Sequence, residues 1–146
     1  MIGIDTNILI YARVADSPWY NQASAFLDGL RDNSNVVIAE LVLVEYYLAL
    51  RNPAVLSPAL GAAAATAECQ SLRKHPRWAL VENANVMDGI WQETAQPGFA
   101  RRRIIDLRLA RTLQSHGVTE FATANVGDFE GLGFARVWNP ITSMVR

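Results

Sequence analysis

The chain is poor in the residues that cross-link a fold or bind zinc. Of its 146 residues only Cys69 is a cysteine, which excludes a disulfide within the chain. The two histidines, His75 and His116, do not combine with it in any familiar zinc-binding spacing. These absences exclude a disulfide-stabilised scaffold and a conventional zinc site, and they fit a reducing compartment.

Long hydrophobic runs are also missing. No apolar stretch reaches the roughly 18 uncharged residues that a membrane-spanning helix requires. The first residues, 1–5, lack the basic start and the apolar segment of a secretory signal peptide. We therefore expect a soluble protein of the cytoplasm.

Excess charge of one sign is absent as well. Thirteen Lys and Arg residues face fourteen Asp and Glu residues, a net charge of -1. No overall basic field is available to attract nucleic acid, so any contact with RNA must be local. The sequence also lacks GxGxxG, GxxxxGK and GxSxG motifs, the signatures of dinucleotide sites, P-loops and serine hydrolases.

What the chain does have is a large apolar fraction in short segments. With 51% hydrophobic residues it can bury the core of one domain, which we expect to span residues 1–146. Apolar runs predict strands at residues 2–4, 36–38, 79–81 and 120–122, with a candidate fifth at 135–137. Helical spacing predicts helices at residues 7–12, 19–30, 40–50, 57–72 and 104–114, and one more, capped by Asn83, that carries Val86, Ile90 and Trp91.

This alternation of strands and helices predicts the fold class. It favours an α/β domain of three layers, with a mostly parallel central sheet of four to five short strands and helices on both faces. Ligands of such sheets bind beyond the carboxyl ends of the strands. Asp5 directly follows the first predicted strand and Asn125 follows the fourth by a few residues, so both are expected at that edge.

Four acids stand among apolar neighbours or beside a turn: Asp5, Glu45, Asp106 and Asp128. Burying an unpaired ionised carboxylate is costly, so acids that converge usually share a cation. Oxygen ligands of this kind favour Mg²⁺ or Mn²⁺. The set therefore predicts a metal-dependent site that cleaves phosphodiesters.

Glu45 is preferred to Glu40 as the acid that the predicted helix 40–50 contributes. The two residues are five positions apart and point about 140° away from each other on a helix. Glu40 falls in the first turn, where the helix dipole explains a carboxylate, whereas Glu45 lies within an apolar run. A surface-facing Glu45 is the structural alternative.

The other acids also have structural alternatives. Asp5 is equally well explained as a helix N-cap. Asp106 shares a helical face with Leu109, whereas Arg108 is expected on the far side; it could instead cap its helix or pair with an arginine of the run 101–103. Asn125 and Asp128 flank a turn, where such residues are common for backbone reasons.

Taken in order, six segments of the sequence resemble the PIN-domain family. They are residues 4–11 around Asp5, 45–53 from Glu45 to Asn52-Pro53, 105–110 around Asp106, 116–117, 123–129 from Thr123 to Phe129, and 138–140, Trp-Asn-Pro. Within that family the chain is similar to the VapC-type toxins of bacterial and archaeal toxin–antitoxin pairs. One position departs from the pattern: Asn125 stands where many relatives have Asp, so Asp128 would supply the fourth carboxylate.

The resemblance implies a magnesium-dependent endoribonuclease, the toxin of a VapBC-type pair, that cleaves RNA through a metal-activated water. Mn²⁺ is expected as a substitute for Mg²⁺, and a cognate antitoxin and a homodimer are implied as partners. The implied catalytic and metal-binding residues are Asp5, Glu45, Asp106 and Asp128. The residues expected to orient them are Thr6, Asn7, Thr123 and Asn125, and the candidate phosphate contacts are Arg13, Arg51, Arg101, Arg102 and Arg103.

Two other functions remain open on sequence alone. A catalytically impaired RNA- or protein-binding module would keep the fold with a site degraded at Asn125. A metal-dependent phosphatase is the other alternative, although Asp5-Thr6-Asn7 lacks the second Asp that haloacid-dehalogenase phosphatases place two residues after the first.

Overall fold

Five short parallel strands form the central sheet in a computed structural model, which describes residues 1–143. The strands are β1 (Ile2–Ile4), β2 (Val36–Ala39), β3 (Ala79–Val81), β4 (Glu120–Ala122) and β5 (Arg136–Trp138). Their order is β3-β2-β1-β4-β5, and every neighbouring pair is parallel. The predicted α/β fold with a parallel sheet is confirmed, including the candidate fifth strand. The predicted domain of residues 1–146 includes three residues, 144–146, that lie outside the described part.

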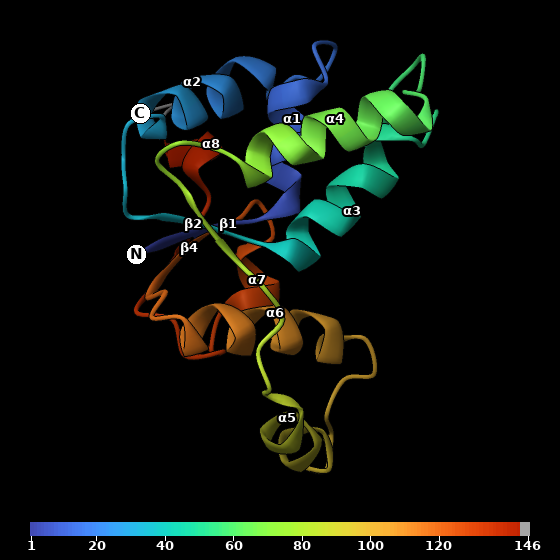
Figure 1. Cartoon of the computed structure of the whole chain (residues 1–146). Helices are drawn as coiled ribbons and strands as arrows, with labels where there is room; N and C mark the ends of the chain where they lie inside the picture. The colour runs from blue at the N-terminus through green and yellow to red at the C-terminus, as the bar shows by residue number, and fades with distance from the viewer. Residues whose placement is uncertain (144–146) are drawn as a thin grey trace.

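The helices pack against both faces of this sheet, as Figure 1 shows. One layer contains α1 (Thr6–Arg13), α2 (Tyr20–Leu30), α3 (Glu40–Leu50), α4 (Ala62–Arg73) and α8 (Pro140–Ser143); the other contains α5 (Met87–Thr94), α6 (Arg103–Ser115) and α7 (Val126–Phe129). The layers explain why β1, β2 and β4 consist mainly of buried residues. No helix within residues 1–143 is long and apolar enough to cross a membrane.

The carboxyl edge of the sheet is organised around β1. This strand lies between β2 and β4, so the chain order reverses at its two sides, and α/β sheets bind ligands at such a point. Gly3 allows the strand to pack closely, because a Cβ atom there would lie 3.0 Å from the Phe121 ring and 3.2 Å from Leu113. Asp5, directly after β1, is thereby placed at the switch point.

Two predicted helix starts are wrong. The helix expected from residue 57 begins at Ala62, because the chain first turns: the Asn52 side chain accepts a hydrogen bond from the Ala54 amide, and the Leu60 amide bonds to the Leu50 carbonyl. The helix after β3 begins at Met87 with Val86 as its N-cap, so Asn83 does not cap it. Propensity alone did not locate these starts, since tertiary contacts decide them.

Two short helices were not predicted. Helix α8 follows Asn139, whose side chain accepts hydrogen bonds from the amides of Ile141 and Thr142 while Pro140 occupies the first turn. This is a normal helix start that an Asn-Pro pair can signal. Helix α7 is a single turn within the segment interpreted as a turn, and it carries Asp128.

Candidate active site

Asp5 is a buried carboxylate held by three hydrogen bonds. It has an extended backbone conformation as the N-cap of α1, and its Oδ1 accepts from the Thr6 amide at 2.8 Å. Its Oδ2 accepts from the side-chain Nδ2 of Asn7 at 2.8 Å and from the Thr123 hydroxyl at 2.6 Å. The residue is 6% exposed. Asp5 is therefore a helix cap and also a fixed acid at the rim of a cavity, so its two sequence interpretations do not exclude each other.

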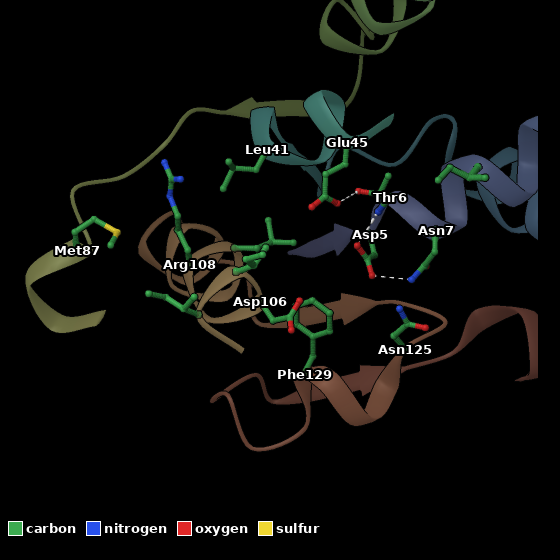
Figure 2. Close-up of a pocket in the computed structure, with 14 residues that line it drawn as sticks. Asp5, Thr6, Asn7, Leu41, Glu45, Met87, Asp106, Arg108, Asn125 and Phe129 are labelled. Carbon is green, nitrogen blue, oxygen red and sulfur yellow. Dashed lines mark hydrogen bonds between the residues drawn. The ribbon is translucent and has the colours of Figure 1, made fainter. Parts of the chain in front are cut away.

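Glu45 reaches the same place from α3. Its Oε2 accepts a hydrogen bond from the Thr6 hydroxyl at 2.8 Å, which ties the second acid to the residue beside the first (Figure 2). The residue as a whole is exposed, so the surface-facing alternative is correct for its side-chain position, although the carboxylate borders the cavity. Glu40 points elsewhere and forms a salt bridge with Arg73. The preference for Glu45 over Glu40 agrees with this arrangement.

Asp106 and Asp128 complete an acidic cleft made of two adjoining cavities. Asp5, Glu45 and Asp106 line a cavity of about 500 Å³. Glu45 and Asp106 also line a second cavity of about 530 Å³, together with Asp128. Asp5 follows β1, and the other three acids come from α3, α6 and α7, so residues far apart in sequence meet at one edge of the sheet. Figure 2 shows Asp5, Glu45 and Asp106.

Mutual repulsion and burial act on these acids. The pKa of Asp5 is raised to about 6, mainly by burial; the hydrogen bonds from Thr123 and Thr6 oppose this rise, and the charges of Glu45 and Asp106 contribute to it. Burial also raises the pKa of Asp106, and the charges of Asp128 and Glu45 add to that increase. A cluster that resists ionisation in this way is stabilised by a nearby cation.

The donor set fits a hard divalent cation, with one restriction. Within residues 1–143, no three Asp, Glu, His or Cys side chains stand close enough together to form a metal-binding group without rearrangement. Mg²⁺ does not require such a group, because it usually keeps several waters and binds through one or two carboxylates plus substrate phosphates. The shared-cation interpretation of the four acids therefore stays a prediction that the oxygen chemistry of the cleft supports.

Of the four polar residues expected to orient the acids, Thr6, Asn7 and Thr123 form hydrogen bonds with them, and the Asn125 side chain forms none within residues 1–143. Thr123 is fully buried, and its hydroxyl also accepts a hydrogen bond from the Asn125 amide at 3.0 Å. The Asn7 side chain connects the two strand ends, since its oxygen accepts from the Ala124 amide at 3.0 Å. The side chain of Asn125 lines the cavity and is exposed. It is therefore available to a substrate, while Asp128 faces the second cavity.

The predicted arginine contacts fall into two groups. Arg102 and Arg103 line the second cavity beside Asp106 and Asp128, whereas Arg101 is exposed and lines neither cavity. Arg13 and Arg51 lie elsewhere. The first pairs with Glu68 at 3.0 Å, and the second stacks over the Tyr47 ring, 5.7 Å from its centre. Of these five predicted arginines, only Arg102 and Arg103 are positioned to meet a phosphate at this cleft.

Sequence reasoning missed the apolar wall of the first cavity and placed Arg108 wrongly. Ile10, Leu41, Met87 and Ile104 line this cavity with the acids. Arg108, expected on the far side of its helix from Asp106, lines it as well. The reason is that Ile105, three residues before Arg108 and therefore beside it on the helix, also faces the cavity. The cavity follows this edge of α6, which the position of Asp106 alone did not indicate.

Thr123→Val is expected to lower activity by about 10- to 100-fold, the usual effect of losing a partner that orients a ligand. Valine has the shape of threonine but cannot donate to Asp5, and the pKa of Asp5 should rise further. Cleavage rates measured at several pH values would reveal both effects. Thr112→Val is the matched control: Thr112 is 1% exposed, and its hydroxyl has no hydrogen-bond partner within residues 1–143. Equal activity of the two variants would contradict a positioning role for Thr123.

The fold and the acidic cleft at its switch point are those of a PIN-like domain. Solved structures with a similar backbone include VapC20 from Mycobacterium tuberculosis, at 16% identity and a TM-score of 0.68 over 92% of this chain and 97% of that one. VapBC2 from Rickettsia felis has 18% identity and a TM-score of 0.63 over 95% and 98%. FitAcB from Neisseria gonorrhoeae has 19% identity and a TM-score of 0.61 over 96% and 98%.

The sequence comparison is more specific. Two curated sequences of Ribonuclease VapC24, from the CDC 1551 / Oshkosh and H37Rv strains of Mycobacterium tuberculosis, are each 50% identical to this chain over 143 residues, which is 98% of this chain and 99% of the relative. The chain therefore belongs to the VapC family of ribonucleases. No protein-family model matches the chain. The predicted family and enzyme class are confirmed.

Proposed function

We propose that this chain is a metal-dependent endoribonuclease, the toxin of a toxin–antitoxin pair, with RNA as its substrate and Mg²⁺ or Mn²⁺ as its cofactor. The observation that carries the proposal is the convergence of Asp5, Glu45 and Asp106 on one cavity in a chain that is 50% identical to a ribonuclease. The structural neighbour VapC20 is a toxin that cleaves the sarcin–ricin loop.

The carboxylates are the groups that would hold the metal. Asp5, Asp106 and Glu45 would bind it, with Asp128 at the adjoining cavity. A bound Mg²⁺ would supply positive charge to phosphate oxygens and a water that is a better nucleophile. Neither histidine lines either cavity, so no imidazole is positioned to act as the base.

The chain itself contributes orientation and charge. Thr123 and Asn7 fix one oxygen of Asp5, and Thr6 fixes Glu45, so these carboxylates need little reorganisation when a substrate binds. Arg102 lies at the wall of the second cavity, where a phosphate next to the cleaved one would meet a guanidinium. The acids alone would repel RNA, and this arginine offsets part of that repulsion.

Protein partners form the second part of the proposal: a cognate antitoxin and a second copy of the chain, in the cytoplasm. Val44 and Leu48 lie on the outer face of α3 beside Glu45, and they are 58% and 62% exposed. Exposed apolar residues grouped on one helix face favour a protein contact. VapBC2 from Rickettsia felis was solved bound to a DNA fragment from the promoter of the pair, which supports a two-protein assembly for this family.

The activity is tested by incubating the purified chain with a pool of structured RNAs in Mg²⁺, in Mn²⁺ and in EDTA. We expect discrete products with either metal and none in EDTA. The carboxylates are negative, so without a cation they cannot stabilise the negative charge of a phosphate transition state. A phosphomonoester in parallel reactions provides the comparison for phosphatase chemistry. Turnover of that compound with intact RNA would contradict the ribonuclease proposal.

A further inference from the structure

The first cavity is larger and more apolar than metal binding requires. Its acids lie in the middle, and half-buried Ile10, Leu41, Met87 and Ile104 form its walls. In Figure 2, Met87 and Arg108 lie at the opposite end from Asn7. The volume of about 500 Å³ falls within the range of small-molecule sites, about 300–1,000 Å³. A hydrated phosphate would leave this apolar surface uncovered.

A nucleobase matches the apolar part of the cavity. It is flat and apolar on its faces, and single-stranded RNA is bound by stacking such faces on side chains. Met87 offers an adaptable thioether that contacts aromatic rings favourably, and Phe129 also lines the cavity, with 3% of its surface exposed. The cavity adjoins the acids, so the base that enters it belongs to a nucleotide next to the cleaved phosphate.

Arg108 provides the polar contact that selects among bases. It is exposed, and within residues 1–143 it takes part in none of the five salt bridges. Its neighbour Arg111, by contrast, is bound by Glu93 and the Leu132 carbonyl. A guanidinium presents a rigid set of N–H donors, and on the Hoogsteen edge of the bases only guanine offers two adjacent acceptors, O6 and N7, to such a pair.

We propose that this cavity binds one unstacked guanine beside the cleaved phosphate, and that Arg108 determines the preference by donating to its O6 and N7 atoms. The inference rests on the proposed ribonuclease function and extends it to substrate specificity. Met87 and Leu41 then contact the faces of the base, while Arg102, in the second cavity, contacts the backbone on the other side of the acids.

The test uses a pool of randomised single-stranded RNA, with sequencing of the cut ends to give nucleotide frequencies on both sides of the cleavage point. The wild-type protein should enrich guanine at one flanking position. Arg108→Gln should lose that enrichment at that position only, by about 5- to 150-fold in relative rate, because glutamine matches adenine better. Arg31→Gln is the matched control, since Arg31 is an exposed arginine whose one salt bridge within residues 1–143 is with Asp28.

Other outcomes of the sequencing experiment would overturn the proposal. A uniform loss of rate with an unchanged preference would make Arg108 a phosphate contact. An unchanged preference and an unchanged rate would leave the apolar cavity as a protein-docking surface. No cleavage by the wild-type protein would instead remove the ribonuclease proposal on which the inference rests.

A binding measurement separates the cavity from the chemistry. The methyl resonance of Met87 should shift when guanosine monophosphate is added without divalent metal, and shift less with cytidine monophosphate. Arg108→Gln should reduce the response to the guanine nucleotide. If no nucleotide moves the Met87 resonance, the base-binding site is refuted even for a protein that cleaves RNA.

Discussion

Replacing Asp5 with asparagine is expected to lower the rate of RNA cleavage by about 10²- to 10³-fold. This is the usual cost of removing one group that stabilises the charge of a transition state. Asp5 is the most buried of the four acids and the one whose two oxygens are fixed by three donors. Asparagine removes the negative charge that would hold a cation and turns an amide group toward donors that require an acceptor. The measurement is single-turnover cleavage at saturating Mg²⁺.

Loss of folding would mimic this result, so a second acid provides the control. Asp106 is only half-buried, and no hydrogen bond from another side chain to it is present within residues 1–143. Asp106→Asn should therefore fold normally and lose activity to a similar extent. Glu40→Gln removes a carboxylate that is bound to Arg73 and lines neither cavity, and it should keep near-wild-type activity. Full activity in Asp106→Asn would show that the acidic cleft is not the site of cleavage.

The sequence predicted that the acids converge because their placement depends on local rules, whereas their role as metal ligands stays a prediction. Asp5 comes directly after a buried strand, and a parallel sheet delivers such residues to one edge. Glu45 was separated from Glu40 by helix geometry and by the dipole explanation for the first turn. All five predicted strands matched within one residue at each end, because short apolar runs bounded by polar turns leave little freedom.

The apolar cavity was not predictable in the same way. Its walls come from α1, α3, α5 and α6, and no periodicity in a single segment reports how four helices leave a space between them. Met87 lies at the start of a helix whose N-terminus was placed wrongly, and Arg108 was assigned a face relative to one acid rather than to the cavity. Similarly, Arg13 looked like a free cation until the fold brought Glu68 beside it.

Stability without metal is expected to fall as the pH rises, because of Asp5. The pKa of this carboxyl is 3.8 as an ordinary value and about 6 in the folded protein. The folded state therefore keeps a proton that the unfolded state releases between these two values. The stability contributed by this residue is greatest below pH 3.8. It falls by about 1.36 kcal/mol per pH unit as the pH rises to about 6, and above that pH the loss is complete at about 3 kcal/mol.

Comparison of the wild-type protein with Asp5→Asn isolates that contribution. Urea unfolding in EDTA at about pH 4 and about pH 7.5 gives the change in free energy of unfolding for each protein, and the difference between the two changes belongs to Asp5. The wild-type protein should lose more stability over this interval than the variant. Parallel pH profiles would show that Asp5 titrates normally and that its burial places no strain on the metal-free fold.

Bound metal should restore the stability that is lost on ionising Asp5, and only at pH values where Asp5 is ionised. At about 100 times its dissociation constant, Mg²⁺ would stabilise the folded protein by about 2.7 kcal/mol, which is similar in size to the cost of ionising Asp5. Below about pH 6 a proton must leave Asp5 before it can bind a cation, so the affinity should fall by about tenfold for each further pH unit. Unfolding titrations at both pH values, with and without Mg²⁺, measure this directly. Stabilisation that is equal at both pH values, or that persists in Asp5→Asn, would place the metal away from Asp5.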